Sequence, residues 1–417
     1  MKKSITLLCV LVALFLGTAA GVASAFDLES KGIEELKAMK YLPDQILVKF
    51  RKGESEVVRA KVHRTLGALK VTDSYGKFYQ VVTVPEGRVE AMVRAYQRNP
   101  HVEYAEPDYL RFANMIPDDP LYISQWSFPQ INLPAAWNRS SGAGVTVAVV
   151  DTGVNPDGED SFGGRVIMGQ SFVRTAKNSS DDNGHGTHVA GTVGQETNNQ
   201  TGCAGIAFDA TILAVKVLNK RGVGFSSGIV DGIRWAADNG ADVMNFSFGS
   251  STSSLTEEEA INYAHGKDVV ICAASGNDGT NTVGYPAAYE NCIAVGSTRY
   301  DRHRAPYSNY GAELDVVAPG GDTSVDQNSD GNPDGILQET FMKRFRSYAW
   351  DYYYFQGTSM ATPHVSGVAA LIRSLHPAFT ADQVRQAIEN SAQDLGPQGW
   401  DAEFGWGLVD ADASLGR

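Results

Sequence analysis

Ser359 has the surroundings most suggestive of nucleophilic chemistry in this sequence. It follows Gly357 and Thr358, and an apolar-periodic run over 365–375 comes after it. This pattern predicts a helix with Ser359 at or near its N-terminus and Pro363 in the first turn, where its missing N–H costs little. The helix dipole and the unpaired N–H groups favour negative charge there, which suits an oxygen nucleophile that passes through an anionic adduct. Taken alone, a Gly-Thr-Ser sequence is more often a cap or a turn.

Two further residues supply an acid and a base. Asp151 ends a short β-branched run over 145–150, and His185 lies between glycines where another helix is expected to begin. A serine hydroxyl is a poor nucleophile until a base takes its proton, and imidazole titrates near neutral pH. A carboxylate can hold the imidazole in the right tautomer and stabilise the imidazolium. The alternatives are a core histidine or a metal pair of His185 with His188, for which no third ligand is apparent. We interpret His188 and His364 as structural.

The three residues occur in the order Asp, His, Ser, which is the order found in subtilisin. The sequences around them, 147–154, 183–191 and 356–367, all match that pattern. The chain therefore resembles the subtilisin-like serine proteases (subtilases), strongly from about Asp118 onwards and more weakly before it. The resemblance implies an exported serine endopeptidase that hydrolyses peptide bonds through an acyl-enzyme.

The resemblance also extends to residues that would bind the substrate. The segment 275–279 is similar to the oxyanion segment of the family, in which Asn277 gives a side-chain amide and Ser359 its own N–H; an Asn-Asp-Gly turn is the plainer alternative. The primary specificity pocket would be lined by Ser247, Phe248, Gly249, Ala274, Ser275 and Gly276, with Gly284 at its base. Because Gly284 leaves room and brings no charge, we predict a preference for large apolar residues before the cut. The segment 247–249 can also pair with an extended peptide as an added strand.

The apolar pattern of the chain after residue 116 predicts the elements that position these residues. Continuous apolar runs at 145–150, 212–218, 243–246, 269–273, 292–295 and 314–318 predict strands. Helices are expected between and after them, at 186–193, 226–239, 257–265, from Ser359 onwards and at 381–390. Continuous apolar strands that alternate with helices indicate an α/β fold, a parallel sheet flanked by helices on both faces. Sites in such sheets form at the C-terminal ends of the strands, where Asp151 lies.

The segment before this domain reads as a small α+β sandwich, ferredoxin-like in class. Strands are expected at 44–50, 78–84 and 102–106, and helices at 55–66 and 89–97. The segment is similar to the inhibitory prodomain of subtilases, which assists folding and then blocks the active site; a separate binding module is the alternative. We expect self-cleavage within 109–116, after Met115 in preference to Phe112. The expected domains are therefore a prodomain at 26–115 and a catalytic domain at 116–417.

Residues 1–25 predict a signal peptide and hence an exported protein. Lys2 and Lys3 precede an apolar stretch at 5–16, and residues 23–25 form an Ala-x-Ala exit. The apolar stretch is too short for a membrane anchor. The net charge of −13 lies mostly after residue 116, which argues against nucleic acid as a partner. We expect protein or peptide substrates, and a freely released monomer. Three cysteines follow the signal peptide; Cys272 and Cys292 are either bridged or, as we prefer, buried thiols.

Calcium is expected at two places. Asp119, Asp160 and Asn199 match ligands of the strong calcium site of the family, where Thr197, Thr201 and Cys203 would add carbonyl oxygens. The second place rests on spacing alone, because acid, amide and glycine alternate as in a calcium loop at Asp326, Asn328, Asp330, Gly331, Asn332 and Asp334. Leu337 stands where an EF-hand has a glutamate, so the loop is not a standard one. The alternatives are an acidic turn and a solvated loop.

Two rival functions use the same fold. A scaffold or recognition protein with silent chemistry would be favoured by missing triad residues, and none is missing. Transfer of the acyl group to nucleophiles other than water would use the same residues as hydrolysis.

Overall fold

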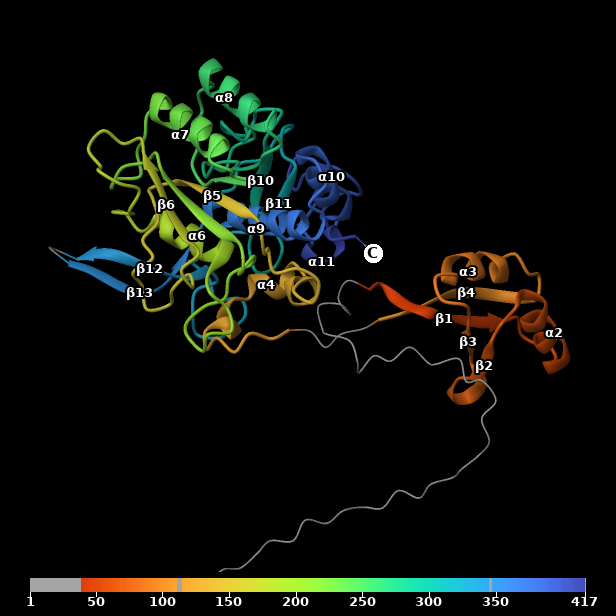
Figure 1. Ribbon diagram of the computed structural model, residues 1–417. Helices are drawn as coiled ribbons and strands as arrows, with labels where there is room; N and C mark the ends of the chain where they lie inside the picture. The colour runs from red at the N-terminus through yellow and green to blue at the C-terminus, as the bar shows by residue number, and fades with distance from the viewer. Residues whose placement is uncertain (1–38, 111–114, 345–346, 417) are drawn as a thin grey trace, which may run out of the picture. The chain divides into compact units, whose positions relative to one another are not determined.

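The computed structural model describes residues 39–110, 115–344 and 347–416 (Figure 1). The predicted signal peptide and Phe112 of the predicted junction lie outside these residues. The chain divides into two compact units after Phe112. The predicted domain boundary at Met115 remains a prediction.

The first unit is a four-stranded antiparallel sheet with two helices. Its elements are β1 (Tyr41–Phe50), α2 (Glu56–Leu66), β2 (Lys70–Asp73), a short 3₁₀ turn (Tyr75–Lys77), β3 (Gln80–Thr83), α3 (Val89–Gln97) and β4 (Val102–Tyr109). The strand order β2-β3-β1-β4 confirms the predicted ferredoxin-like class. Ser55 caps α2 by accepting a hydrogen bond from Val58 N. The prediction missed β2, because all four of its residues are exposed and leave no apolar pattern.

A seven-stranded parallel sheet forms the centre of the second unit. Its order is β11-β10-β9-β8-β5-β7-β6, and the strands are β5 (Thr146–Asp151), β6 (Val166–Ser171), β7 (Thr211–Lys216), β8 (Val243–Phe246), β9 (Val270–Ala274), β10 (Ile293–Thr298) and β11 (Val316–Pro319). Strands β8 to β11 are buried throughout, as expected for strands covered on both faces. The predicted fold class is therefore confirmed. Only β6, at the edge of the sheet, was not predicted.

Helices cover both faces of this sheet (Figure 1). α6 (His185–Gly194) and α9 (Thr358–Leu375) pack against each other on one face, and α7 (Ser226–Asp238) and α8 (Leu255–His265) pack together on the other. The remaining helical segments are the turn Tyr122–Ser124, α4 (Ser127–Gln130), α5 (Leu133–Ala136), α10 (Ala381–Ser391) and α11 (Ala411–Ser414). Almost all of α9 is buried, which agrees with its mostly apolar and small side chains. Ser359 is its second residue, as predicted.

A long two-stranded ribbon, β12 (Ile336–Arg344) and β13 (Ser347–Phe355), directly precedes α9. Neither strand of the ribbon was predicted from the sequence. The ring of Phe355, the last residue of β13, stacks on His188 of α6 with centroids 4.4 Å apart. Ile336 to Phe341 are buried, whereas β13 is partly exposed.

Two further expectations concern cysteines and membranes. Cys203, Cys272 and Cys292 are free and buried, which agrees with our preference for thiols over a bridge. Within the described ranges, no helix combines the length and the apolar character needed to traverse a bilayer.

Candidate active site

Asp151 and His185 meet at the C-terminal edge of the parallel sheet. Asp151 is the last residue of β5 and fully buried, and its Oδ1 lies 2.8 Å from Nδ1 of His185, the first residue of α6. The same oxygen accepts a hydrogen bond from Thr152 N at 2.6 Å. Because Nδ1 faces the carboxylate, Nε2 is the ring nitrogen left to take a proton from another group.

Asp181 fixes the start of α6. Its carboxylate accepts hydrogen bonds from Gly184 N and Thr187 N, at 3.1 and 3.0 Å, so it satisfies N–H groups that the first turn of a helix leaves free. A negative charge at this end is also favoured by the helix dipole. His185 is thus held by a backbone that Asp181 orders.

The environment raises the pKa of His185. Burial on its own would lower that pKa, but the charge of Asp151, the hydrogen bond to it and the charge of Asp181 outweigh the effect. The side chain keeps 26% of its surface exposed, so a reacting group can approach it.

Ser359 lies at the same edge of the sheet. Its Oγ donates to the carbonyl of Ser247 at 2.9 Å, and Ser247 Oγ donates back to the carbonyl of Ser359 at 2.8 Å. Ser247 follows β8, the strand that pairs with β5, so Asp151 and Ser359 border one region. In this conformation the hydroxyl proton of Ser359 points to Ser247 and not to His185. Such contacts commonly tighten only when substrate binds.

Asn277 lies beside Ser359 in an orientation set by Thr358. Its Oδ1 accepts hydrogen bonds from Thr358 N at 2.8 Å and from Thr358 Oγ1 at 2.9 Å. Nδ2 is therefore the part of the amide left for a ligand. A Cβ placed on Gly357, whose φ is +144°, would lie 3.6 Å from both Asn277 Nδ2 and Ser359 N. Both donors thus border one space that a glycine keeps open.

The predicted pocket segments are joined to one another by backbone contacts. Gly284 N donates to Ser275 O, and Tyr285 exchanges two hydrogen bonds with Ser250, all at 2.8 Å. A Cβ on Gly249 would lie 3.8 Å from Ala274 O, and Gly276 N donates to Thr358 Oγ1 at 3.3 Å. Phe248 packs its ring against Phe246. The structure therefore places the predicted pocket residues next to the Ser359 turn.

His188 and His364 are fully buried, and their ring nitrogens contact carbonyl or hydroxyl oxygens of neighbouring residues. His188 Nε2 lies 3.0 Å from Ile336 O, and burial lowers its pKa to about 3. His364 contacts Met360 O and Ser127 Oγ, both at 2.9 Å, and burial lowers its pKa to about 4. Both are therefore neutral at ordinary pH, which agrees with a structural role.

The residues of the first predicted calcium site gather around two buried carboxylates. Asp160 and Asp119 are 1% and 4% exposed. Asp160 accepts hydrogen bonds from Cys203 N at 2.6 Å and from Asn199 Nδ2 at 3.2 Å, and Asp119 accepts from Asn199 N at 3.4 Å. Burial, together with the charge of Asp119, raises the pKa of Asp160 to about 7 against the effect of these bonds.

The other members of this predicted site are the threonines of the same loop. Thr201 N donates to Asn199 Oδ1 at 2.7 Å, and Thr197 Oγ1 accepts from Gly205 N at 3.0 Å. In the part of the chain that the structure describes, no three histidine, cysteine, aspartate or glutamate side chains converge on a metal position. A calcium ion in this loop would therefore depend on amide and backbone carbonyl oxygens besides its carboxylates.

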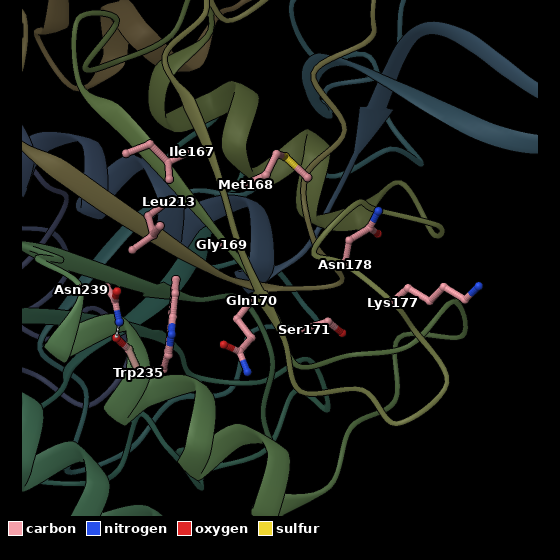
Figure 2. A pocket seen from close by; sticks show the side chains of 10 residues that line it. All are labelled: Ile167, Met168, Gly169, Gln170, Ser171, Lys177, Asn178, Leu213, Trp235 and Asn239. Carbon is pink, nitrogen blue, oxygen red and sulfur yellow. Dashed lines mark hydrogen bonds between the residues drawn. The ribbon is translucent and has the colours of Figure 1, made fainter.

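A hollow of about 520 Å³ lies along β6, the outermost strand of the sheet (Figure 2). Trp235 of α7 and Leu213 of β7 contribute apolar surface to it, beside the exposed Ile167 and Met168 of β6. It contains none of the predicted site residues, so it is separate from the Ser359 region.

Comparison with known proteins decides the family. The family model for the subtilase family, Peptidase_S8, matches residues 142–407, which is more than half of the chain. The chain belongs to the subtilase family. A second model, for the N-terminal prodomain of fervidolysin, matches residues 28–108. This subtilase is thus a subtilisin-like serine protease that carries a prodomain.

Relatives and solved structures agree with this assignment. The subtilase is 40% identical over 368 residues to the thermophilic serine proteinase of Bacillus sp. (strain AK1), covering 88% of this chain and 86% of the relative. A protease structure from Pseudoalteromonas arctica PAMC 21717 aligns with a TM-score of 0.65 and 35% identity, over 72% of this chain and 99% of the other. Fervidolysin from Fervidobacterium pennivorans, described as a keratinolytic enzyme related to subtilisin, aligns with a TM-score of 0.62 and 27% identity, over 90% of this subtilase and 61% of fervidolysin.

Three residues that organise the site were not predicted from the sequence. Thr358 orients Asn277, and Asp181 holds the start of α6. The buried Lys216 donates to Thr152 O, next to Asp151, and pairs with Asp182 at 2.7 Å. Thr358 lies inside the Gly-Thr-Ser stretch, and Asp181 precedes an expected helix start, so both had a local signal. A lysine at the end of the β7 strand had none.

Proposed function

We propose that this subtilase is an endopeptidase in which Asp151, His185 and Ser359 form a catalytic triad. The observation that carries the proposal is the 2.8 Å contact of His185 Nδ1 with Asp151 Oδ1, because it leaves Nε2 as the base. Ser359 lies at the same edge of the sheet, because its Oγ donates to the carbonyl of Ser247, which follows β8.

Peptide hydrolysis would then proceed in two halves. Ser359 Oγ gives its proton to His185 Nε2 and attacks the peptide carbonyl, and Asp151 stabilises the imidazolium that forms. Asn277 Nδ2 and Ser359 N donate to the oxyanion in the space that Gly357 leaves open. His185 returns the proton to the leaving amine, and the acyl-enzyme is hydrolysed by water activated in the same way.

The pocket supports broad specificity with a preference for large apolar residues before the cut. Its proposed walls, 247–249 and 274–276, lie close together, since a Cβ on Gly249 would lie 3.8 Å from Ala274 O. Gly284 brings neither bulk nor charge to its base. A panel of peptides that differ only in the residue before the cut tests this. We expect the highest kcat/KM for Phe, Tyr, Leu or Met; equal or better cleavage after Arg or Lys would refute it.

The prodomain is proposed to inhibit its own protease domain until it is cut off by self-cleavage after Met115 or Phe112. The intact masses of the protein and of Ser359→Ala, both expressed without residues 1–25, test this. We expect a fragment ending within 112–116 to be lost from the first protein only. Cleavage of both would mean that another protease does the processing.

Calcium is proposed to bind at the Asp160 loop, held by Asp119, Asp160 and Asn199 with carbonyl oxygens of Thr197, Thr201 and Cys203. Two buried carboxylates that form no ion pair within the described residues fit a divalent cation. When bound, the ion would neutralise these charges. We expect chelation to lower the Tm of the wild type. In Asp160→Asn, most of the decrease in Tm that is due to this site should be absent. An unchanged Tm of the wild type on chelation would refute the site.

We also propose that the predicted signal peptide directs export and that the protein is then released as a monomer. Fusion of residues 1–25 to a reporter enzyme, with a variant in which Lys2 and Lys3 are both replaced by glutamate as control, would measure export directly. Retention of the reporter inside the cell would refute it.

A further inference from the structure

Lys216 is a buried cation beside the proposed catalytic acid. It is the last residue of β7, its side chain is 1% exposed, and its Cα is paired with that of Asp151 in the sheet. Its Nζ donates a hydrogen bond to Thr152 O and lies 2.7 Å from Asp182 Oδ1. One ammonium group therefore joins the segment that follows Asp151 to the segment that precedes His185.

The polar groups of Thr152 all bind within this junction. Its N–H donates at 2.6 Å to Asp151 Oδ1, the oxygen that contacts His185. Its Oγ1 accepts at 2.9 Å from Gly186 N, in the first turn of α6. Its carbonyl oxygen accepts from Lys216. A shift of Thr152 would therefore disturb both the acid and the helix that carries the base.

Asp182 belongs to the turn that leads into α6. The residue before it, Asp181, caps the helix, and the residue after it, Asn183, accepts a hydrogen bond from His185 N at 3.1 Å. The ion pair with Lys216 thus holds a turn whose neighbours on both sides fix the start of α6.

Stability alone does not account for a charge at this place. Removal of an ammonium group from water is costly, and solvent weakens its attraction to the side chain of Asp182, which is 38% exposed. Well-packed apolar side chains often replace a buried ion pair without loss of stability. An apolar side chain could not, however, bind a carbonyl and a carboxylate oxygen through one atom.

We propose that Lys216 is a positioning residue that keeps Asp151 and His185 at their contact distance. It does so by holding Thr152 O and Asp182 Oδ1 on one ammonium group. Because Lys216 is buried, it acts through these two partners and not on the substrate. The inference rests on the proposed triad, since it concerns the geometry of two of its members.

The first test is steady-state kinetics of Lys216→Met on a peptide anilide. Methionine keeps the length of the side chain and removes the ammonium group. We expect kcat to fall by about 10- to 100-fold with KM within about twofold, because a misplacement of about 1 Å can lower a rate by about 100-fold. Lys177→Met, at an exposed position that lines the hollow, removes the same charge and should leave kcat unchanged. Intact mass checks that all proteins assayed are in the same processed form.

Two variants at the other end of the link separate position from charge. Asp182→Asn and Asp182→Ala both remove the negative charge, but only asparagine keeps an oxygen that accepts from Lys216 Nζ. We expect the conservative Asp182→Asn to keep kcat within about threefold, and Asp182→Ala to lose it as Lys216→Met does. The double variant Lys216→Met/Asp182→Ala should lose no more than either single one, because both break the same link. Equal losses in Asp182→Asn and Asp182→Ala would overturn the proposal.

The contact between acid and base is observed directly by proton NMR. The proton that His185 Nδ1 donates to Asp151 resonates far downfield, because the bond is short and its acceptor is ionised. It is measured in Ser359→Ala, expressed without residues 1–25, and assigned by its loss in the additional variant His185→Ala. No processing is needed for this measurement.

Added changes to this protein give the decisive comparison. Lys216→Met and Asp182→Ala should each move the signal upfield and broaden it through faster exchange with water, whereas Asp182→Asn and Lys177→Met should leave it in place. Because Asp182 is partly exposed, Asp182→Ala keeps the test open even where Lys216→Met folds poorly. A loss of signal and kcat in Asp182→Ala only together with a lowered Tm would show a structural role and refute the proposal.

The outcomes also separate this proposal from that of the triad. An unchanged signal and wild-type kcat in both Lys216→Met and Asp182→Ala would refute the positioning role and leave the triad standing. Failure of the triad would look different. The wild-type protein would cleave no peptide and Ser359→Ala would show no His185 signal, before any change at Lys216 is made.

Discussion

The two halves of the proposed triad are held in different ways. Asp151 and His185 are joined by one short contact between a carboxylate and an imidazole, and the two residues lie only 34 positions apart in the sequence. Ser359 is held by neutral hydrogen bonds to Ser247, 112 residues away, and its partner Asn277 is held by Thr358. The position of the base is thus determined mainly by its interaction with a carboxylate. The position of the nucleophile is determined by packing and by backbone contacts between segments that are distant in the sequence.

This difference predicts how each half fails. Changes near His185 should alter the pH at which the enzyme works, because they alter a charge interaction. Changes near Ser359 should lower the rate at every pH, because they misplace neutral donors and the hydroxyl.

Removal of either reacting group should have the largest effect. Ser359→Ala and His185→Ala should each lower kcat by about 10⁶-fold, the loss that such changes cause in subtilisin itself. The double variant should lose no more than the single ones, because the two residues act as a unit. Steady-state kinetics on a peptide anilide measures all three, and additive losses would show that the residues act separately.

Loss of the oxyanion amide should come next. Asn277→Ala should lower kcat by about 10²–10³-fold with little change in KM, a magnitude known from the equivalent amide of subtilisin. The next residue, Asp278, cannot replace the lost donor, because an ionised carboxylate only accepts hydrogen bonds. A loss below tenfold would show that Asn277 does not face the developing charge.

Loss of the hydroxyl that orients Asn277 should have a smaller effect. Thr358→Val keeps the shape of the side chain but removes one of the two bonds to Asn277 Oδ1, so kcat should fall by about 3- to 10-fold. Thr358→Ser should restore it. The pH profile should not move in either variant; a moved profile would contradict the separation between the two halves.

The smallest expected effect is on the pH profile. The pKa of His185 is raised, and the base must be neutral to act, so kcat/KM should be lost as the pH falls through a midpoint above 6.5. Asp181→Asn removes one of the charges that raise this pKa, so the midpoint should fall by less than about one pH unit. Asp231→Asn, at an exposed position of α7, is the control and should leave the midpoint in place.

The sequence predicted most of the fold because the core strands are continuous apolar runs. It missed β6, in which Ile167 and Met168 are exposed at the sheet edge, because an edge strand lacks such a run. It also missed the ribbon, because the buried part of β12 contains Gln338, Glu339 and Thr340. Their polar groups bind other parts of the protein; Glu339, for example, accepts from Asp160 N at 3.1 Å. Buried polar residues of this kind interrupt the pattern of apolar residues from which a strand is predicted.

The residue types of the site were predictable, but their contacts were not. Gly-Thr-Ser and His-Gly-Thr-His stretches are local patterns, so Ser359 and His185 could be found in them. The bond of Ser359 to Ser247, and the role of Thr358 in turning Asn277, depend on segments about 80 to 110 residues apart. No local pattern encodes such distances.

The most direct test of the account is covalent labelling of the folded protein with a fluorophosphonate, followed by peptide mapping by mass spectrometry. Such a reagent reacts with a serine only where a base and an oxyanion site activate it. We predict one adduct, on Ser359, that His185→Ala abolishes and Asp351→Asn leaves intact. An adduct on another residue, or on Ser359 in the absence of His185 at the same rate, would contradict the proposed triad.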